Sequence, residues 1–376
     1  MTEQPTRVLI AGAGIAGLET ALALRALAGD RVAIAVIAPE DEFEYHPVST
    51  VRPYAVGRAR RIRLADVLAD ANAELFSLEV TGVDTDSRLV RTTRGREFEY
   101  DELVLALGTD AVPVVDRART WDDRTGGETL GGLLRDFEHG YSTTLAVVIP
   151  PGPVWPLRGY ELALLFALDA RGMGVNIHTS LIAPDRSPLA ALGDLAVEAV
   201  SNALAEAGVT IVSASQVRIE PGPPQTLVAY PSGERLAVDR VLALPTLRGR
   251  QITGVPVDEH GFVETDEHCR VRGLDHLWAI GDVTAFPVKS GGLAAEQAAV
   301  AAESIASAAG AAIRPREFAP VGHPELAGLP AGRHLDEWLA AKDGAGSSTH
   351  LRERGLPVLT YLLRDFQAGW REQSER

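Results

Sequence analysis

The sequence predicts an α/β protein with two domains of the same type, the first split by insertion of the second. The order strand, glycine turn, helix, strand occurs over residues 8–41, and residues 144–185 repeat that order with a proline-rich turn. Each repeat is a βαβ unit, and such units build parallel sheets covered by helices. A Gly-Asp pair at residues 281–282, after the second unit, is assigned to the first domain. We therefore predict two Rossmann-like domains.

The first unit begins with a short apolar strand over residues 7–11 and continues in a helix that includes residues 18–24. Gly12 permits the tight turn between them, Gly14 lets the backbone approach a pyrophosphate, and Gly17 lets helix and strand pack closely. The first N–H groups of the helix have no partner inside it and can bind phosphate oxygens. The turn predicts a dinucleotide site that includes Gly12, Gly14, Ile15, Ala16 and Gly17.

The segments after the first unit give less specific signals. Residues 73–100 have hairpin character and lead into a buried strand over residues 103–109. An alanine-rich helix is predicted over residues 290–309, and it ends at Gly310, a usual residue after a helix C-terminus. Residues 315–350 are rich in Pro and Gly and predict loops around one short helix.

The tail over residues 357–370 is predicted to be helical, because its apolar residues recur at helical spacing. Few basic residues accompany this stripe, so we expect it to pack on the protein's own core or on a second copy in a homodimer rather than on a membrane. The apolar stripe consists of Leu359, Leu362, Leu363, Phe366 and Trp370.

Bulk properties exclude several classes of function. The formal net charge of −15 over 376 residues disfavours nucleic acid as a partner, since a protein that binds nucleic acid needs a basic face. Cys269 is the only cysteine, which excludes an internal disulfide, a redox pair of cysteines and a cysteine-held iron–sulfur cluster. The histidines show no metal-ligand spacing, and no leader or membrane-spanning run is visible, so we expect a cytoplasmic protein.

These motifs resemble those of the flavoproteins with two dinucleotide-binding domains, within the pyridine nucleotide-disulfide oxidoreductase superfamily. The likeness covers residues 7–310 and is to the branch of sulfide:quinone oxidoreductases, flavocytochrome c sulfide dehydrogenases and type II NADH dehydrogenases. It implies FAD, and the binding is expected to be non-covalent because Cys269 lies outside the motifs. Residues 44–47 stand where the family places side chains against the isoalloxazine, and residues 286–292 resemble the segment under the flavin pyrimidine ring.

The resemblance assigns a role to several further residues. The glycine turn would hold the FAD pyrophosphate, and Asp282 would bond the ribitol. The strand that ends at residue 109 would lie beside the FAD. The cofactor-binding set is therefore completed by Pro47, Ala106, Leu107, Gly108, Gly281, Asp282, Lys289 and Gly291.

Lys289 and His46 are the candidate catalytic residues. Reduction of a flavin places negative charge at N1 and the C2 carbonyl, and a cation or a helix N-terminus stabilises that charge. Lys289 directly precedes the predicted helix at residue 290, although an exposed surface lysine is the alternative interpretation. His46 titrates near neutrality and could tune the flavin or exchange a proton, or it could be a surface-loop histidine.

Three features depart from the family pattern. Ala38 stands where an acidic residue would bind the ribose, and we assign that role to Glu40, two residues further on. The redox cysteines of the sulfide-oxidising members are absent. The second turn, residues 150–161, lacks the three-glycine pattern, and its prolines cannot donate N–H groups to a pyrophosphate, so NAD(P)H binding there is doubtful. These prolines are Pro150, Pro151, Pro153 and Pro156.

We expect an FAD-dependent oxidoreductase that passes a hydride or electrons from a small-molecule donor to a quinone-like or other diffusible acceptor. Two alternatives remain: an NAD(P)H:acceptor reductase, and a flavin-binding interaction module without turnover. Trp155 and Tyr160 could line the donor pocket or be buried. The expected domains are residues 1–115 with 245–320 for FAD, 116–244 for the degenerate nucleotide-type domain, and 321–376 for a C-terminal segment.

Overall fold

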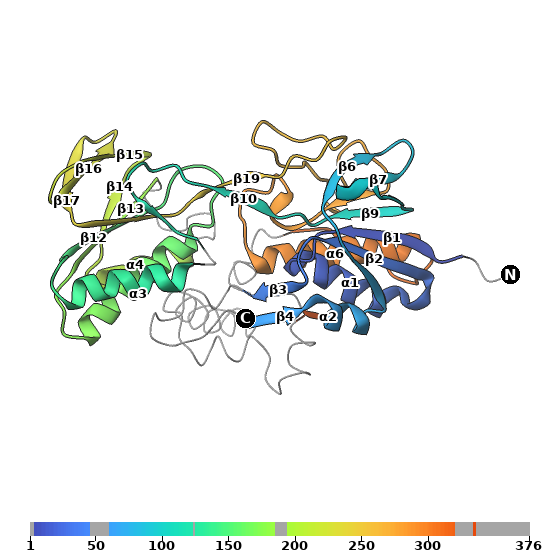
Figure 1. Ribbon diagram of the computed structural model, residues 1–376, viewed down its shortest axis with the longest axis horizontal. Helices are drawn as coiled ribbons and strands as arrows, with labels where there is room; N and C mark the ends of the chain where they lie inside the picture. Colours follow the sequence, from blue (N-terminus) through green and yellow to red (C-terminus); the bar gives the residue numbers. More distant parts are fainter. Residues whose placement is uncertain (1–3, 46–59, 123–124, 185–193, 320–333, 336–376) are drawn as a thin grey trace, which may run out of the picture.

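The computed structural model describes residues 4–45, 60–122, 125–184, 194–319 and 334–335. In Figure 1 these residues form two lobes, each built around its own sheet. The predicted α/β fold with parallel sheets is confirmed. The predicted tail helix over residues 357–370 lies outside the described residues.

The first lobe is organised by a five-stranded parallel sheet in the order β20-β9-β1-β2-β5. Strands β1, β2 and β9 are almost entirely apolar and buried, as a sheet covered on both faces requires. Strand β20 follows the second lobe in the sequence and pairs with β9. The sheet of the first lobe is therefore completed by a strand that the chain supplies after the whole second lobe. The strands are β1 (Thr6–Ala11), β2 (Val32–Ala38), β5 (Ala73–Ser77), β9 (Glu102–Leu105) and β20 (Leu277–Ala279).

Helices cover one face of this sheet. Helix α1 (Ile15–Ala28) packs along α6 (Gly291–Ala308), and both share one apolar core with the short helix α2 (Leu64–Asp70). The many alanines of α1 and α6 allow this close approach. Helix α6 starts directly after the capping residue Ser290, whose hydroxyl accepts the N–H of Leu293 over 3.2 Å.

The other face carries a three-stranded antiparallel meander, which accounts for the hairpin character in the sequence. Its strands are β6 (Val80–Asp84), β7 (Leu89–Thr92) and β8 (Glu97–Glu99). A separate two-stranded hairpin joins β3 (Glu42–Tyr45) to β4 (Arg60–Arg63), which leads into α2.

The second lobe repeats the design with a parallel sheet in the order β11-β18-β12-β13-β14. Helices and a small antiparallel sheet pack on its two faces. The parallel strands are β11 (Arg119–Thr120), β12 (Thr144–Val148), β13 (His178–Ala183), β14 (Thr210–Ser213) and β18 (Arg240–Ala243). The helices are α3 (Gly126–Glu138), α4 (Leu157–Gly172) and α5 (Asp194–Ala207), and the antiparallel strands are β15 (Gln216–Glu220), β16 (Gln225–Tyr230) and β17 (Glu234–Val238).

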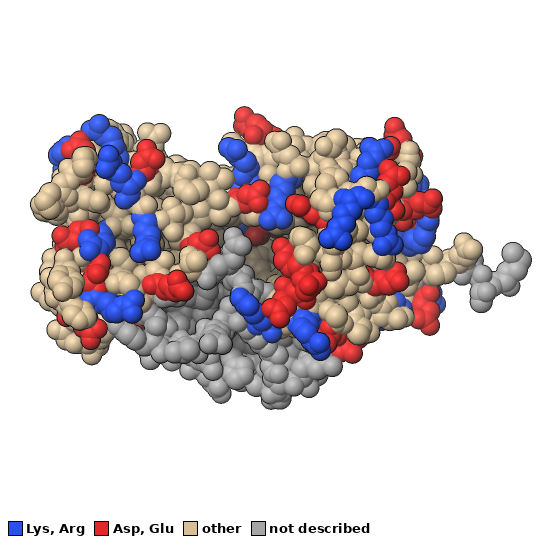
Figure 2. All heavy atoms as spheres, in the orientation of Figure 1, with Lys and Arg blue, Asp and Glu red and all other residues tan. Residues whose placement is uncertain are grey.

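An antiparallel ribbon joins the lobes at the centre of Figure 1. It consists of β10 (Thr109–Val112), on the way into the second lobe, and β19 (Thr246–Gly249), on the way out. On the face in Figure 2, acidic and basic side chains are interspersed over both lobes. Within the described ranges, no helix is both long and apolar enough to cross a bilayer.

Candidate functional site

The turn after β1 depends on glycine at two positions. Gly12 has a φ of +106°, and its N–H donates to the carbonyl of Ile37 over 2.8 Å, which ties the turn to the end of β2. A Cβ atom on Gly12 would lie 2.3 Å from the carbonyl oxygen of Ala106, in the segment after β9. A Cβ on Gly17 would lie 2.0 Å from the carbonyl oxygen of Gly12. Glycine is therefore required at both positions for the backbone to pack.

Gly14 is free of such contacts. It is exposed, and a Cβ built on it would meet no atom within 4 Å. It is the N-terminal capping residue of α1, whose first turn contains no acidic residue. Within the described residues, no side chain caps the first N–H groups of this helix, and uncapped N–H groups at a helix N-terminus are the donors that a pyrophosphate needs. The residues present fit an FAD pyrophosphate at this point.

The segment after β9 lies against the same turn. Ala106 donates its N–H to the carbonyl of Ala11 over 2.8 Å, and Ile280 donates to the carbonyl of Leu105 over 3.0 Å. These bonds set the two residues after Ala106 beside the end of β1. Leu107 is half-buried, and Gly108 has a φ of +67° with open space around its missing Cβ. The backbone here leaves room for a ligand along the sheet edge.

The two distant sequence motifs meet at Gly281. The short helix η5 (Gly281–Val283) lies between the first turns of α1 and α6, because a Cβ on Gly281 would stand 3.2 Å from Cβ of Ala16 and 3.4 Å from Cβ of Ala294. Asp282 follows directly and is half-buried. The structure thus brings the glycine turn, the Gly-Asp pair and the N-terminus of α6 to one edge of the sheet.

Gln297 is a functional candidate that sequence reasoning missed. Its side chain is buried on α6, and its Oε1 accepts the N–H of Gly281 over 2.6 Å. Its Nε2 lies 3.4 Å from the hydroxyl of Thr284, which itself donates to the carbonyl of Gly281 over 2.9 Å. The only signal in the sequence was a lone amide among the alanines of the helix. Gln297 fixes the conformation of the turn that carries Asp282.

Lys289 is buried, with 3% of its side chain exposed, so the alternative of an exposed surface lysine is wrong. Its ammonium donates to the carbonyl of Thr284 and lies 4.0 Å from the centre of the Phe262 ring. Burial lowers the pKa of Lys289 to about 8, against the attraction of Asp282 and Asp258. The helix N-terminus at Gly291 lies two residues further on.

The ribose-binding region is described only in part. Glu40 is exposed after the end of β2, while the neighbouring Asp41 accepts a hydrogen bond from the hydroxyl of Ser77 over 2.9 Å. The carboxylate of Asp41 is already hydrogen-bonded to Ser77, whereas the exposed carboxylate of Glu40 can bind a ligand. Glu40 is therefore the better placed of the two acids. His46 and Pro47 lie outside the described residues.

The turn of the second lobe differs from the first in chemistry. The carbonyl of Pro153 accepts the N–H of Leu247 over 2.7 Å, which fixes the turn to β19. Gly159 plays the packing role of Gly17, because its Cβ would lie 2.4 Å from the side chain of Ile149. Tyr160 is buried, and Trp155 is half-buried against the core of this lobe. Of the two interpretations of these aromatic residues, burial applies to Tyr160.

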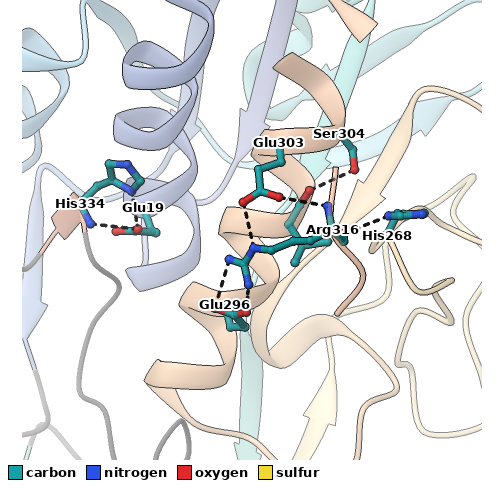
Figure 3. Close-up of polar contacts among 8 residues, drawn as sticks. Glu19, His268, Glu296, Glu303, Ser304, Arg316 and His334 are labelled. Carbon is teal, nitrogen blue, oxygen red and sulfur yellow. Dashed lines mark hydrogen bonds and ion pairs between the residues drawn. The ribbon is translucent and has the colours of Figure 1, made fainter. Parts of the chain in front are cut away.

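Two polar clusters join the residues that follow α6 to the first lobe (Figure 3). The buried carboxylate of Glu19 on α1 accepts the N–H and the ring Nδ1 of His334, over 3.0 and 2.8 Å, and the N–H of Leu335 over 2.7 Å. Arg316 bonds Glu296 and Glu303, both on α6. Phe318 then packs edge-to-face on Phe286, at 5.3 Å between ring centres. The Phe318 contact reaches the segment before Lys289, and the polar contacts hold residues 316 and 334–335 against α6 and α1.

Residues 6–310 match the model of a protein family, the pyridine nucleotide-disulphide oxidoreductases. An NADH dehydrogenase-like protein of Mycobacterium tuberculosis is 34% identical over 306 residues, which cover 74% of this chain and 73% of the relative. The ferredoxin–NAD(+) reductase subunit of the benzene 1,2-dioxygenase system of Pseudomonas putida is 28% identical over 343 residues, 85% of this chain and 78% of that one. These similarities confirm the family resemblance predicted from the motifs.

A solved structure shows the same fold. The sulfide:quinone oxidoreductase of Aquifex aeolicus superposes with a TM-score of 0.70 over 81% of this chain and 77% of its own. The two sequences are 18% identical in the superposition, so this likeness concerns the fold alone.

Proposed function

Because the chain belongs to the pyridine nucleotide-disulphide oxidoreductase family, we propose that it passes a hydride or electrons from a small donor through FAD to a quinone-like or other diffusible acceptor. It is a flavin-dependent oxidoreductase, and the FAD is held non-covalently. When bound, the flavin supplies the redox chemistry, and the protein supplies binding, orientation and electrostatics. The alternative of a flavin-binding module without turnover is not retained, since the relatives are enzymes.

One observation carries the proposal: the first turn of α1, which no described side chain caps, the Gly281–Val283 turn and the first turn of α6 converge at one sheet edge. The N–H groups after Gly14 hold the pyrophosphate, and Asp282 bonds the ribitol hydroxyls. Glu40 bonds the ribose. The ammonium of Lys289 and the N-terminus of α6 provide positive potential where the reduced flavin carries negative charge. His46 and Pro47 are assigned to the flavin face.

The proposed donor is smaller than a dinucleotide. A pyrophosphate binds through backbone N–H groups, whereas the turn over residues 150–156 contains four prolines, listed above, and its Pro153 carbonyl is engaged by β19. A small or apolar donor does not need those N–H groups. We also propose the domain division at residues 115/116 and 244/245, and a cytoplasmic location.

A second candidate is an NAD(P)H:acceptor reductase. It is favoured by the names of the two relatives, an NADH dehydrogenase-like protein and a ferredoxin–NAD(+) reductase subunit. It requires the nicotinamide nucleotide to bind the second lobe without a glycine turn.

The test begins with the visible spectrum of the purified protein, which should be that of bound FAD, released by denaturation. Anaerobic stopped-flow mixing with NADH and with NADPH then follows the flavin absorbance, alongside a panel of small donors. We expect slow or no bleaching with either nucleotide and fast, saturable bleaching with one of the small donors. Saturable bleaching at roughly tens per second with a nucleotide, within the usual range of turnover rates, would favour the second candidate. A colourless protein that takes up no FAD would contradict both.

A further inference from the structure

The ammonium of Lys289 is held by groups from two separate segments. Its own segment contributes the carbonyl of Thr284, which accepts a hydrogen bond from Nζ. The loop between β19 and β20 contributes the ring of Phe262, whose centre lies 4.0 Å from Nζ. Phe262 and Lys289 are each 3% exposed, so this contact is formed away from water. A cation over an aromatic face is attracted by the ring quadrupole, and the attraction grows when water is excluded.

The backbone fixes the position of the Phe262 ring. Val263 donates its N–H to the carbonyl of Val283 over 2.9 Å and accepts the N–H of Ala285 over 2.8 Å, so the loop is paired with the turn that carries Asp282. On the other side, the N–H of Phe262 donates to Oδ1 of Asp258 over 2.8 Å. Hydrogen bonds at Phe262 and at Val263 therefore fix the backbone from which the ring projects.

The same loop is packed tightly against the ribbon between the lobes. Gly249, the last residue of β19, donates its N–H to the carbonyl of His260 over 3.1 Å. A Cβ on Gly249 would lie 1.9 Å from the carbonyl oxygen of Gly261, directly before Phe262. This close backbone contact leaves the loop little freedom to move away from Lys289.

We propose that Phe262 is a positioning residue: the face of its ring holds the Lys289 ammonium, charged and in place, beside the turn that carries Asp282. The inference rests on the proposed function in that the charge held there acts on the flavin. Burial alone drives a lysine towards its neutral form. Within the described residues, the ionisable groups that act on the ammonium are Asp282 and Asp258, and both favour its charged form. The Thr284 carbonyl and the Phe262 ring contact the ammonium directly. The ring therefore adds to what keeps the lysine charged.

The chain offers a direct measurement, because Lys289 and Lys342 are its only lysines. Protein labelled with 13C at lysine Cε gives two side-chain signals in solution NMR, and Lys342→Arg assigns them. The Lys289 signal should titrate near pH 8 in the FAD-free wild type. Phe262→Leu keeps the site apolar but removes the ring face, so the titration midpoint should fall by about 0.5–1.5 pH units.

A second replacement separates ring electrostatics from packing. Incorporation of 3,5-difluorophenylalanine at position 262 keeps the ring shape and weakens the negative potential of its face, so the Lys289 midpoint should fall by a smaller amount. This replacement also tests the proposal if Phe262→Leu does not fold. An unchanged Lys289 midpoint in the folded variants would overturn the role of Phe262.

The flavin potential gives the functional readout. At pH 5, Lys289 is charged in wild type and variants, so their midpoint potentials should agree. Near pH 7.5, a variant with a lowered Lys289 midpoint has lost more of its positive charge, so its flavin should be harder to reduce. Equal potentials at both pH values, with a shifted Lys289 midpoint, would separate Lys289 from the flavin and overturn that part of the proposal. If the wild type binds no FAD, the proposed function fails, and the NMR titration still decides the Phe262 contact.

Discussion

The backbone of Gly17 on α1 lies against the carbonyl oxygen of Gly12, so that a Cβ atom on Gly17 would stand 2.0 Å from that oxygen. Neither partner can move freely, because Gly12 is itself bonded to Ile37 and packed against Ala106. Gly14, between them, has open space instead. The glycines of one turn therefore serve different purposes, and alanine substitutions distinguish them.

Gly17→Ala should destabilise the protein by about 2–4 kcal/mol, since the methyl group overlaps backbone atoms. Gly14→Ala should leave the stability of the FAD-free protein nearly unchanged and weaken FAD binding at least about tenfold, a loss near 1.4 kcal/mol. Urea unfolding of the FAD-free proteins and titration with FAD measure the two effects. Full FAD affinity in Gly14→Ala would contradict the placement of the pyrophosphate.

Asp282→Ala should lower FAD occupancy, because it removes a charged acceptor for the ribitol hydroxyls, worth about 1.5–3 kcal/mol. Asp282→Asn, which keeps a neutral acceptor, should lose less. Asp86→Ala, which removes an exposed carboxylate in the turn between β6 and β7, is the control. The ratio of flavin to protein absorbance after dialysis reports occupancy. Equal occupancy in all four proteins would disprove the role assigned to Asp282.

Gln297→Met should destabilise the turn that carries Asp282. The substitution leaves the N–H of Gly281 without its acceptor in a buried place, at a cost of about 1–3 kcal/mol. FAD affinity should fall with it, because the turn loses its defined conformation. Ser304→Ala on the same helix removes a hydroxyl that donates within α6, to the carbonyl of Val300, and should change neither quantity. Loss of stability without loss of affinity would restrict Gln297 to a packing role.

Lys289→Met should raise stability and lower the flavin potential together. Because burial lowers the pKa of Lys289 from 10.5 to about 8, the charged side chain opposes folding at every pH below about 8, and the cost disappears between pH 8 and 10.5. Loss of the hydrogen bond to Thr284 offsets part of this gain in stability. The free energy of unfolding of Lys289→Met should therefore exceed that of the wild type by about 1–2 kcal/mol at pH 7. Urea unfolding of the FAD-free protein measures the first effect, and redox titration of the loaded protein measures the second.

Lys342→Met is the control for the loss of one lysine. A Lys289→Met protein that is less stable than wild type, with an unaltered potential, would show that the lysine is structural.

Asp239→Asn should reduce stability in a pH-dependent way. The carboxylate accepts the N–H groups of Thr143 and Thr144, over 2.7 and 3.0 Å, and these bonds hold its pKa below the usual range. A depressed carboxyl pKa stabilises the fold above the unfolded value, near 4, and this contribution is lost as pH falls through the folded value. The difference between wild type and variant should be about 1–2 kcal/mol at pH 7 and should shrink below pH 4. Denaturant midpoints from pH 3 to 7 test this, and a constant difference would contradict it.

The sequence predicted the turns and helices whose formation depends on residues adjacent in the chain. The glycine turn, the helix after it and the alanine-rich helix after Lys289 each follow from residues adjacent in the chain, and α1 and α6 form there. The helix predicted at residues 18–24 extends from Ile15 to Ala28 in the structure, after the non-helical residues Gly12 and Gly14. Its length exceeds the prediction because packing of the apolar face, more than local propensity, stabilises a helix in a folded protein.

The contacts that shape the site could not be predicted in the same way. Gln297 accepts a hydrogen bond from Gly281, the ring of Phe262 lies against the ammonium of Lys289, and Glu19 accepts a hydrogen bond from His334. In each pair the two residues are brought together by sheet order and helix packing, and neither carries a motif of its own. A polar residue on an apolar helix was the available hint for Gln297 and Glu19. His46, Pro47 and the tail helix stay predictions, since they lie outside the described residues.

The place of β20 in the first sheet bears on how the protein is made. Strand β20 pairs with β9, and α6 covers α1, but both are synthesised after the whole second lobe. Until about residue 308 has left the ribosome, β9 is an open sheet edge and the apolar surface of α1 is bare. The second lobe, whose strands are contiguous in the nascent chain, can fold before that. The flavin site should therefore be the last part of the molecule to form during translation, and chains truncated before α6 should be prone to aggregate.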